Sequence, residues 1–529
     1  MVSCPVTVTY SCFSEGRRHH RGAALPSTGK RMLKRRRPVW QRTAVWQGVA
    51  WFLPLILATI AVLRWGVGMF AIAVIGLLAL PGFTSLPSWI WAAFAVTSTT
   101  LGGLATSSGV LPSVFVFADF GFVYIGLISV LARNWSVPRA PEARRLSRAL
   151  LLLLAVILAS WVLHPSDAER PFVTFLLWAE PFALILMMLI EPPSKEQQRW
   201  LLGLLTVLVA IQLPFAVYQA RTAGVGDPVV GTLVGYGAGA HLMAGIAILG
   251  GVSLMVWGYH RSVSWGLLAT LLAAPFTILI PVLADAKQVT FALPFAGLVL
   301  LIAVPGLIRK IGVLVPIAGA LLVLLLVVPT GRTAVMYLEN ASQGRSGKLI
   351  ATDIILEQMK WDPSAWFFGF GPANGISRAA FMTTPALGAE SPISVLGLQP
   401  ATIPSLVLSR IEPLARATSF NSPVSSALGV FSDIGIVGVL VFTWMIACVC
   451  IPLLRTRTWV ARAALAGWIM SFPLAITFDW WEEPPFMLLL ALLTGVALAD
   501  RQRFSRSQRP RTEIGRHEGS GRGAPASSP

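Results

Sequence analysis

Charged residues and cysteines are scarce in this 529-residue chain. Only 12% of its residues are charged, whereas 55% are hydrophobic and the mean hydropathy is +0.72. A soluble protein of this length needs far more polar residues to cover its core, so a soluble globular fold is excluded. None of the four cysteines lies between 330 and 432, so no disulfide framework is expected in that segment.

Two further absences narrow the functional classes. We find no internal repeat of the kind that marks many transporters. The segment 330–432 contains neither histidine nor cysteine, and its acidic residues are scattered. Metal sites are built from such residues in close groups, so the sequence predicts chemistry without a metal or another cofactor.

Long apolar runs dominate what the chain does contain. Runs of roughly 17–22 residues match the length that crosses the hydrocarbon core of a bilayer as a helix. They lack the alternation of barrel strands, and backbone groups in lipid must bond internally, so each run should be helical. We predict an all-α polytopic integral membrane protein with about fourteen transmembrane helices, near 45–63, 66–81, 86–106, 111–132, 149–164, 171–190, 200–219, 238–257, 264–283, 288–306, 311–329, 433–454, 458–477 and 484–499.

The basic residues set the predicted orientation. The chain has 41 lysines and arginines, and about 30 of them fall in alternate segments that are cytoplasmic if the N-terminus is inside. The net charge of +18 therefore reflects topology and does not indicate nucleic-acid binding. The predicted order is a basic cytoplasmic tail (1–44), helices 1–11 (45–329), a large extracytoplasmic loop (330–432), helices 12–14 (433–499) and a disordered cytoplasmic tail (500–529).

The loop at 330–432 is much longer than the other predicted outer loops, and loops of this length are usually functional. From Gly347 to Trp361, apolar and polar residues follow the pattern of an amphipathic helix, which Asp362-Pro363 should end. Such a helix would lie on the outer membrane face or cap the bundle. The string Gly369-Phe370-Gly371-Pro372 predicts a tight turn whose backbone approaches a neighbour closely.

Several ionisable residues lie in or near predicted spans. Asp119 and Glu180 fall inside spans, where such groups are costly and often functional; neutral, hydrogen-bonded carboxyl groups are the alternative. His241 lies near the outer end of its span, where a lone histidine is more often packed than catalytic. The string Trp480-Trp481-Glu482-Glu483 is typical of an interfacial aromatic belt with exposed charge.

The loop also carries a sequence signature. The string SQGRSGKLIATDIILEQMKWDPSAWFFGFGP, from Ser342 to Pro372, resembles the outer-loop signature of the O-antigen ligase and polymerase superfamily, in which a Gly-Arg pair opens a helix that ends near a GxGP turn. The likeness covers about 230–442. It extends to Gly231-Thr232, GAGAHLMA (237–244), the turn Ala284–Lys287, Asn421-Ser422 and FSDIGIVGVLVF (431–442). The family commonly carries a histidine before the Asn-Ser pair, where this chain has Phe420.

This resemblance implies an enzyme of the bacterial plasma membrane, a glycan polymerase or ligase active at the outer face. Its donor would be a glycan on a polyprenyl diphosphate, and its other partners an acceptor glycan, membrane lipids and a candidate polysaccharide assembly complex. An acceptor hydroxyl would attack the anomeric carbon, and the lipid diphosphate would leave. Basic side chains must hold that diphosphate and stabilise its growing charge, and arginine does so bidentately.

Cations at the outer face are therefore the main candidate site residues. Arg345 matches the motif and lies at a predicted helix N-terminus, where free amides also favour phosphate. Lys287 is the second candidate, with a salt bridge to Asp285 as the alternative. Glu412 is a candidate acceptor base, and Asp433 is a second one. Further predicted substrate-binding residues are Arg410, Arg416, Lys348, Asn421 and His241.

Three other functions stay open. A lipid-linked oligosaccharide flippase or other transporter suits fourteen spans, but that class favours paired halves and small loops. A lipid-dependent mannosyltransferase would carry acidic pairs in a large first outer loop, which here is about Arg64-Trp65 alone. The third alternative is a non-catalytic scaffold of a polysaccharide export complex. The sequence does not distinguish polymerase from ligase, nor does it define the sugar, the linkage or the oligomeric state.

Overall fold

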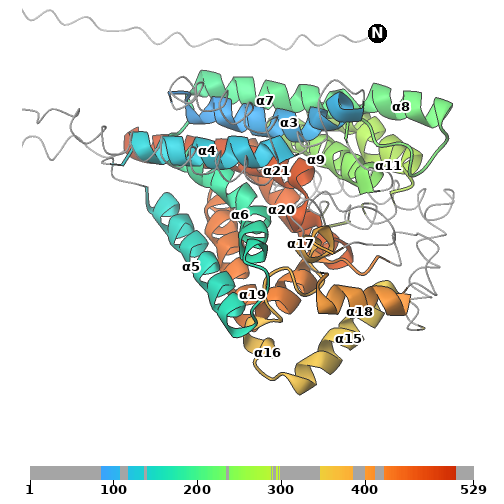
Figure 1. The fold of residues 1–529 in the computed structure, drawn as a ribbon. Coiled ribbons are helices and arrows are strands. Elements are labelled where there is room, and N and C mark those ends of the chain that lie inside the picture. The colour runs from blue at the N-terminus through green and yellow to red at the C-terminus, as the bar shows by residue number, and fades with distance from the viewer. Residues whose placement is uncertain are drawn as a thin grey trace, which may run out of the picture. The chain divides into compact units, whose positions relative to one another are not determined.

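The computed structural model describes residues 85–107, 117–135, 140–233, 238–286, 346–384, 400–411 and 422–507, together with a few single positions between 289 and 343. Within these ranges every regular element is a helix (Figure 1). An all-α architecture is thus confirmed for the part of the chain that the structure describes.

Eight helices in the described ranges are long and apolar enough to cross a membrane, so the chain is a multi-pass membrane protein by helix length and hydropathy. All eight overlap predicted spans. The remaining spans at 45–63, 66–81, 288–306 and 311–329 lie almost wholly outside the described residues, so the number fourteen stays a prediction. The eight are α5 (Pro141–Leu163), α6 (Glu169–Ile190), α7 (Lys195–Ala210) with α8 (Gln212–Thr222), α9 (Ala238–Arg261), α10 (Val263–Ala274) with η2 (Pro275–Leu279) and α11 (Ile280–Leu283), α19 (Ser426–Leu454), α20 (Trp459–Thr477) and α21 (Pro484–Ser507).

Two further helices occupy the neighbouring predicted spans, α3 (Ser88–Ser107) and α4 (Ala118–Arg133). Helices α6 and α9 are the most enclosed, with 83% and 89% of their apolar stretch buried. Both are apolar on all sides, as expected of helices surrounded by others. The outer helices α5 and α10 instead expose large apolar side chains such as Leu151 and Leu271, which suit contact with lipid.

Helix α19 begins earlier than predicted and is broken near its start. It starts at Ser426 instead of 433, and Gly435 interrupts it with φ 66° and ψ −167°. Gly369, in the predicted tight turn, has φ 70° and ψ −169°, a conformation that is essentially reserved for glycine. A Cβ on Gly369 would overlap the backbone of Asp433, and one on Gly435 would overlap the backbone of Phe367. The close approach predicted for this turn is confirmed, and its partner is α19.

The segment 330–432, predicted to be the outer loop, contains four described helices: α15 (Gly347–Trp361), α16 (Ala365–Phe368), α17 (Arg378–Met382) and α18 (Thr402–Ile411). The bounds predicted for the amphipathic helix are those of α15. Its buried side chains pack with α18 into a small separate core that includes Ile355 and Val407 (Figure 1). Trp361 at its end is 82% exposed.

Candidate functional site

The loop after Gly371 wraps around the carboxylate of Asp433, which is fully buried in α19. The carboxylate oxygens accept hydrogen bonds from the Ala373 N–H at 2.9 Å, the Gly375 N–H at 2.8 Å and the Ser377 hydroxyl at 2.6 Å. Hydrogen bonds to an ionised carboxylate are among the strong ones. Both oxygens of Asp433 are therefore engaged in holding the loop.

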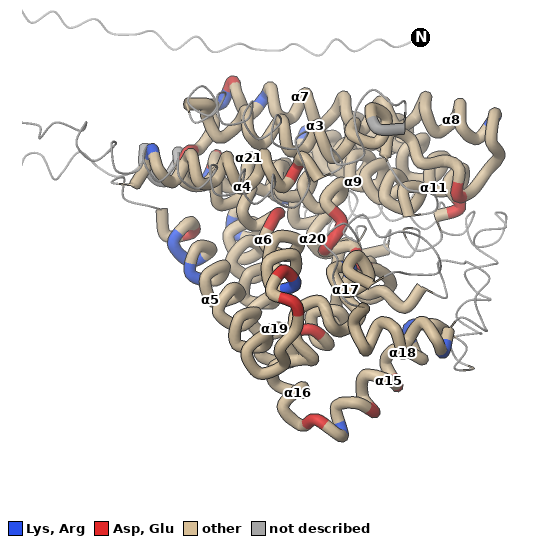
Figure 2. Tube along the Cα trace, viewed as in Figure 1, with Lys and Arg blue, Asp and Glu red and all other residues tan. Residues whose placement is uncertain are grey.

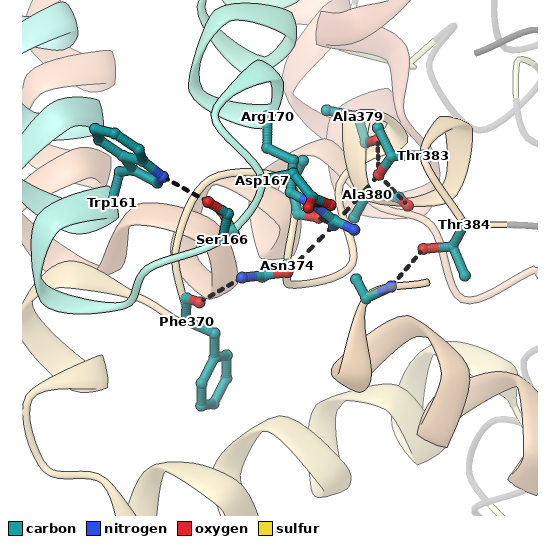
Figure 3. Close-up of polar contacts among 12 residues, drawn as sticks. Trp161, Ser166, Asp167, Arg170, Phe370, Asn374, Ala379, Ala380, Thr383 and Thr384 are labelled. Atoms are coloured by element: carbon teal, nitrogen blue, oxygen red, sulfur yellow. Dashed lines mark hydrogen bonds and ion pairs between the residues drawn. The ribbon is translucent and has the colours of Figure 1, made fainter. Parts of the chain in front are cut away.

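Arg170, in the first turn of α6, holds the same loop from another side (Figure 3). Its side chain is 2% exposed, and its Nη1 donates to the Ala373 carbonyl at 2.6 Å and to Asn374 Oδ1 at 3.2 Å. Its Nε donates to Asp167 Oδ2 at 3.2 Å. A buried guanidinium is stable only with such partners, so the segment 373–377 is fixed between two spanning helices.

This fixed segment leads directly into α17 and places Arg378. Ser377 caps the first turn of α17 with its side chain. Arg378 forms an ion pair with Glu483, and its Nη1 donates to the Glu482 carbonyl at 3.4 Å. The Ala379 N–H donates to Glu482 Oε2 at 3.3 Å. Helix α17 thereby docks onto the connection between α20 and α21, which contains the short helix η4 (Trp480–Glu482).

Lys348 reaches the same end of the spans from the first turn of α15. Its Nζ donates to the Ser422 carbonyl at 2.9 Å and lies 5.0 Å from the centre of the Phe478 ring, a cation–π distance. His241, 5% exposed, faces the same ring with 6.3 Å between ring centroids. Two residues predicted for substrate binding, Lys348 and His241, thus meet at Phe478, the residue that ends α20.

We call Lys348, Arg378, Asp479, Glu482 and Glu483 the outer polar cluster. Asp479 lies within electrostatic range of both Lys348 and Arg378. Burial lowers the pKa of Lys348 from 10.5 to about 8, and the Asp479 charge opposes this shift only in part. Burial also raises the pKa of Glu482 well above its ordinary value and that of Glu483 to about 8, where the Arg378 guanidinium opposes the shift.

Two carboxylates of the spanning region extend this cluster inward. Asp119 on α4 and Glu180 on α6 are each 1% exposed. They lie within electrostatic range of each other and of Arg378. Figure 2 shows acidic positions in the interior beside α6 and α20. Carboxylates inside spans are candidates for function, and here the loop residue Arg378 supplies the partner that the sequence did not reveal.

The segment Gly231-Thr232, which resembles a family motif, is held by two glutamines. Gln219 bonds both the N–H and the carbonyl of Gly231, at 2.7 Å and 2.9 Å. Gln212 accepts from the N–H of Thr232 at 3.0 Å and donates to its hydroxyl at 2.8 Å. In the same loop, the Gly226 N–H donates to the Leu283 carbonyl at 2.8 Å. Two segments of the resemblance, this one and the turn after Leu283, therefore lie together.

The remaining predicted site residues divide into two groups. Arg410 is exposed in the last turn of α18. The other five lie outside the described residues, so nothing here tests them: Arg345, Lys287, Glu412, Arg416 and Asn421.

The sequence analysis missed most of the outer polar cluster. The prediction of exposed charge at 480–483 was wrong: Trp480 and Glu482 are each 1% exposed, because η4 is covered by α17. An indication was present in the sequence. The short connection between two spans holds Asp479, Glu482 and Glu483 and no basic residue, which calls for a cation from elsewhere in the fold.

The cluster places cations beside carboxylates at one end of the spanning helices. Such an arrangement can bind an anionic group and exchange a proton with a hydroxyl. Within the described ranges, no three His, Cys, Asp or Glu side chains are grouped to hold a metal ion. Comparison of the chain with protein-family models and with curated proteins yields no match.

Proposed function

We propose that this protein is a glycosyltransferase of the bacterial plasma membrane, a polymerase or ligase that moves a glycan from a polyprenyl diphosphate to a hydroxyl of an acceptor glycan. The observation that carries the proposal is the outer polar cluster. It brings Lys348 and Arg378, from the long loop, within electrostatic range of carboxylates in the connection between two spanning helices. The resemblance of 342–372 to the O-antigen ligase and polymerase superfamily supports the same reaction.

The cations and the carboxylates of the cluster have different roles in the proposed reaction. The donor carries its own activation, because its leaving group is a lipid diphosphate. Cations stabilise the charge that develops on that leaving group, and loss of one such contact typically lowers the rate about 100–1,000-fold. Arg345, Lys287 and Lys348 are proposed to hold the diphosphate together. Carboxylates suit the acceptor, whose hydroxyl must lose a proton.

The test is a transfer assay with purified protein in lipid nanodiscs. The donor is the pool of polyprenyl-diphosphate-linked glycans extracted from cells that lack the protein, and the products are longer or transferred glycans and free polyprenyl diphosphate. Arg345→Ala should lower transfer about 100-fold or more with unchanged protein abundance. Lys360→Ala, an exposed cation on the same loop, is the matched control and should keep full activity. Activity retained by Arg345→Ala removes that residue from the site.

A second candidate is a lipid-linked oligosaccharide flippase or other transporter. The favouring observation is the group of Asp119, Glu180 and Arg378, since buried carboxylates in spans often serve proton-coupled transport. Proteoliposomes distinguish the two functions. Glycan that crosses the bilayer without lengthening or changing its carrier identifies a transporter, whereas transfer in nanodiscs, which have no second compartment, identifies the enzyme.

A further inference from the structure

Asp479 is a buried carboxylate that forms no capping hydrogen bond with the helix it precedes. It occupies the N-cap of η4, where an aspartate side chain commonly accepts a hydrogen bond from the next turn, yet no such bond forms. The residue is 7% exposed, and its Oδ1 finds no hydrogen-bond partner among the described residues. Buried polar atoms are nearly always paired. The Asp479 side chain hydrogen-bonds with that of Glu483, but its Oδ1 keeps an open position for a hydrogen-bond donor.

The surroundings of Asp479 include Lys348, the described cation that we propose to contribute to donor binding. Asp479 follows Phe478, whose ring lies 5.0 Å from Lys348 Nζ, and it lies within electrostatic range of both cations of the cluster. Lys348 in turn follows Arg345, the residue proposed to hold the diphosphate, by three positions in the sequence. Among the described carboxylates of the cluster, Asp479 is the one whose charge acts on Lys348.

Two other described carboxylates at this end of the spans are fully engaged, and a third is engaged through one oxygen. Asp433 accepts three hydrogen bonds from the loop. Glu483 pairs with Arg378. Glu482 accepts from the Ala379 N–H with one oxygen, and its Oε1 is unpaired like Asp479 Oδ1. The carboxylate whose charge acts on Lys348 is Asp479. The acceptor base is thus best sought at Asp479.

We infer that Asp479 is the base that takes the proton of the acceptor hydroxyl. This inference rests on the proposed function and assigns a catalytic group to it. As the hydroxyl oxygen bonds to the anomeric carbon, its proton passes to Asp479 Oδ1. The bond between that carbon and the diphosphate oxygen breaks, and the electron pair leaves with the polyprenyl diphosphate. Lys348 and Arg378 flank the site and favour the anionic groups on either side of the reacting carbon.

The experiment compares single-turnover transfer by the wild type and by Asp479→Asn in nanodiscs, with the extracted lipid-linked glycans as donor. Asparagine keeps the shape of the side chain but cannot accept the proton. The rate should fall about 100-fold or more, and the residual rate should keep rising with pH as hydroxide replaces the base. The melting temperature should stay unchanged, and affinity for added polyprenyl diphosphate at pH 7 should not fall, because the substitution removes a negative charge beside the cations. Asp353→Asn, on the exposed side of α15, is the matched control.

Two results would overturn the inference while leaving the proposed function standing. One is transfer by Asp479→Asn within tenfold of the wild type. The other is a parallel loss of rate, polyprenyl diphosphate affinity and melting temperature, which would mark a structural residue. If the asparagine variant does not fold, Asp479→Ser is measured in the same way, because a smaller side chain leaves room for water. Absence of transfer by the wild type rejects the proposed function and this inference with it.

Discussion

The crossing of two glycine backbones gives a sharp prediction about how the loop is attached to α19. Gly435→Ala should be strongly destabilising, because its φ of 66° and ψ of −167° suit glycine alone. The added Cβ would also overlap the peptide between Phe367 and Phe368. That peptide is backbone, so no change of rotamer can relieve the overlap. Gly369→Ala should behave alike, since its conformation and contacts mirror those of Gly435.

The expected size follows from two contributions. The backbone strain amounts to about 1–3 kcal/mol, and forced overpacking adds about 1–3 kcal/mol. The loss is therefore about 2–6 kcal/mol. At the usual unfolding entropy per residue, 1 kcal/mol corresponds to about 1 °C for a chain of this length. The melting temperature should fall by about 2–6 °C.

The assay is thermal unfolding of the purified variants, followed by fluorescence-detected size exclusion. Gly203→Ala is the matched control, because Gly203 lies in the spanning helix α7 with nothing within 4 Å of its added Cβ. Alanine is the better helix former by about 1 kcal/mol, so this variant should melt no lower than the wild type. The double variant at 369 and 435 should lose less than the sum of the single losses, because one substitution already opens the crossing. A Gly435→Ala protein as stable as the control would refute this account of the crossing.

Two further predictions concern the loop and its cations. Asp433→Asn should speed limited proteolysis within 373–377, because its amide would face a loop N–H and leave it unpaired at a cost of about 1–3 kcal/mol; unchanged protection would contradict this anchoring role. In the wild type, affinity for polyprenyl diphosphate should fall as pH rises above about 8, because the Lys348 ammonium then loses its proton. In Lys348→Arg the side chain stays charged, so the decline should become smaller. The remaining decline comes from Glu483, which ionises near pH 8 in the same cluster. A fluorescence titration that gives both proteins the same pH dependence would remove Lys348 from the donor site.

The spanning helices could be predicted from the sequence because lipid imposes a simple requirement of long apolar helices. The spans predicted at 171–190 and 264–283 correspond closely to α6 and to α10 through α11. The ends of the helices were less predictable. Helix α5 begins at Pro141, eight residues before the predicted 149, because basic side chains can reach toward head groups while the helix continues. Helix α21 likewise continues to Ser507, past the predicted start of the tail at 500.

Local features of the site could also be predicted from the sequence. The amphipathic periodicity and the following Asp-Pro predicted the bounds of α15, and the GFGP string predicted the tight turn at 369–372. What the pattern could not provide was which distant segments meet. The pairing of Arg378 with Glu483 joins positions 105 residues apart, and no local rule specifies it. The burial of Trp480 and Glu482 depends on the same tertiary contact.

The glycine crossing also sets how motion can spread through the molecule. Side chains usually lie between packed segments and can adjust, but here the backbones of the two segments are in direct contact. The Ser160 hydroxyl of α5 also bonds both segments, at 2.5 Å from the Phe368 carbonyl oxygen and 2.9 Å from the Asp433 carbonyl oxygen. The segment 433–435 of α19 is consequently joined to the loop backbone to backbone. A displacement of α16 would therefore pass to the backbone of α19 without a side chain between them to absorb it.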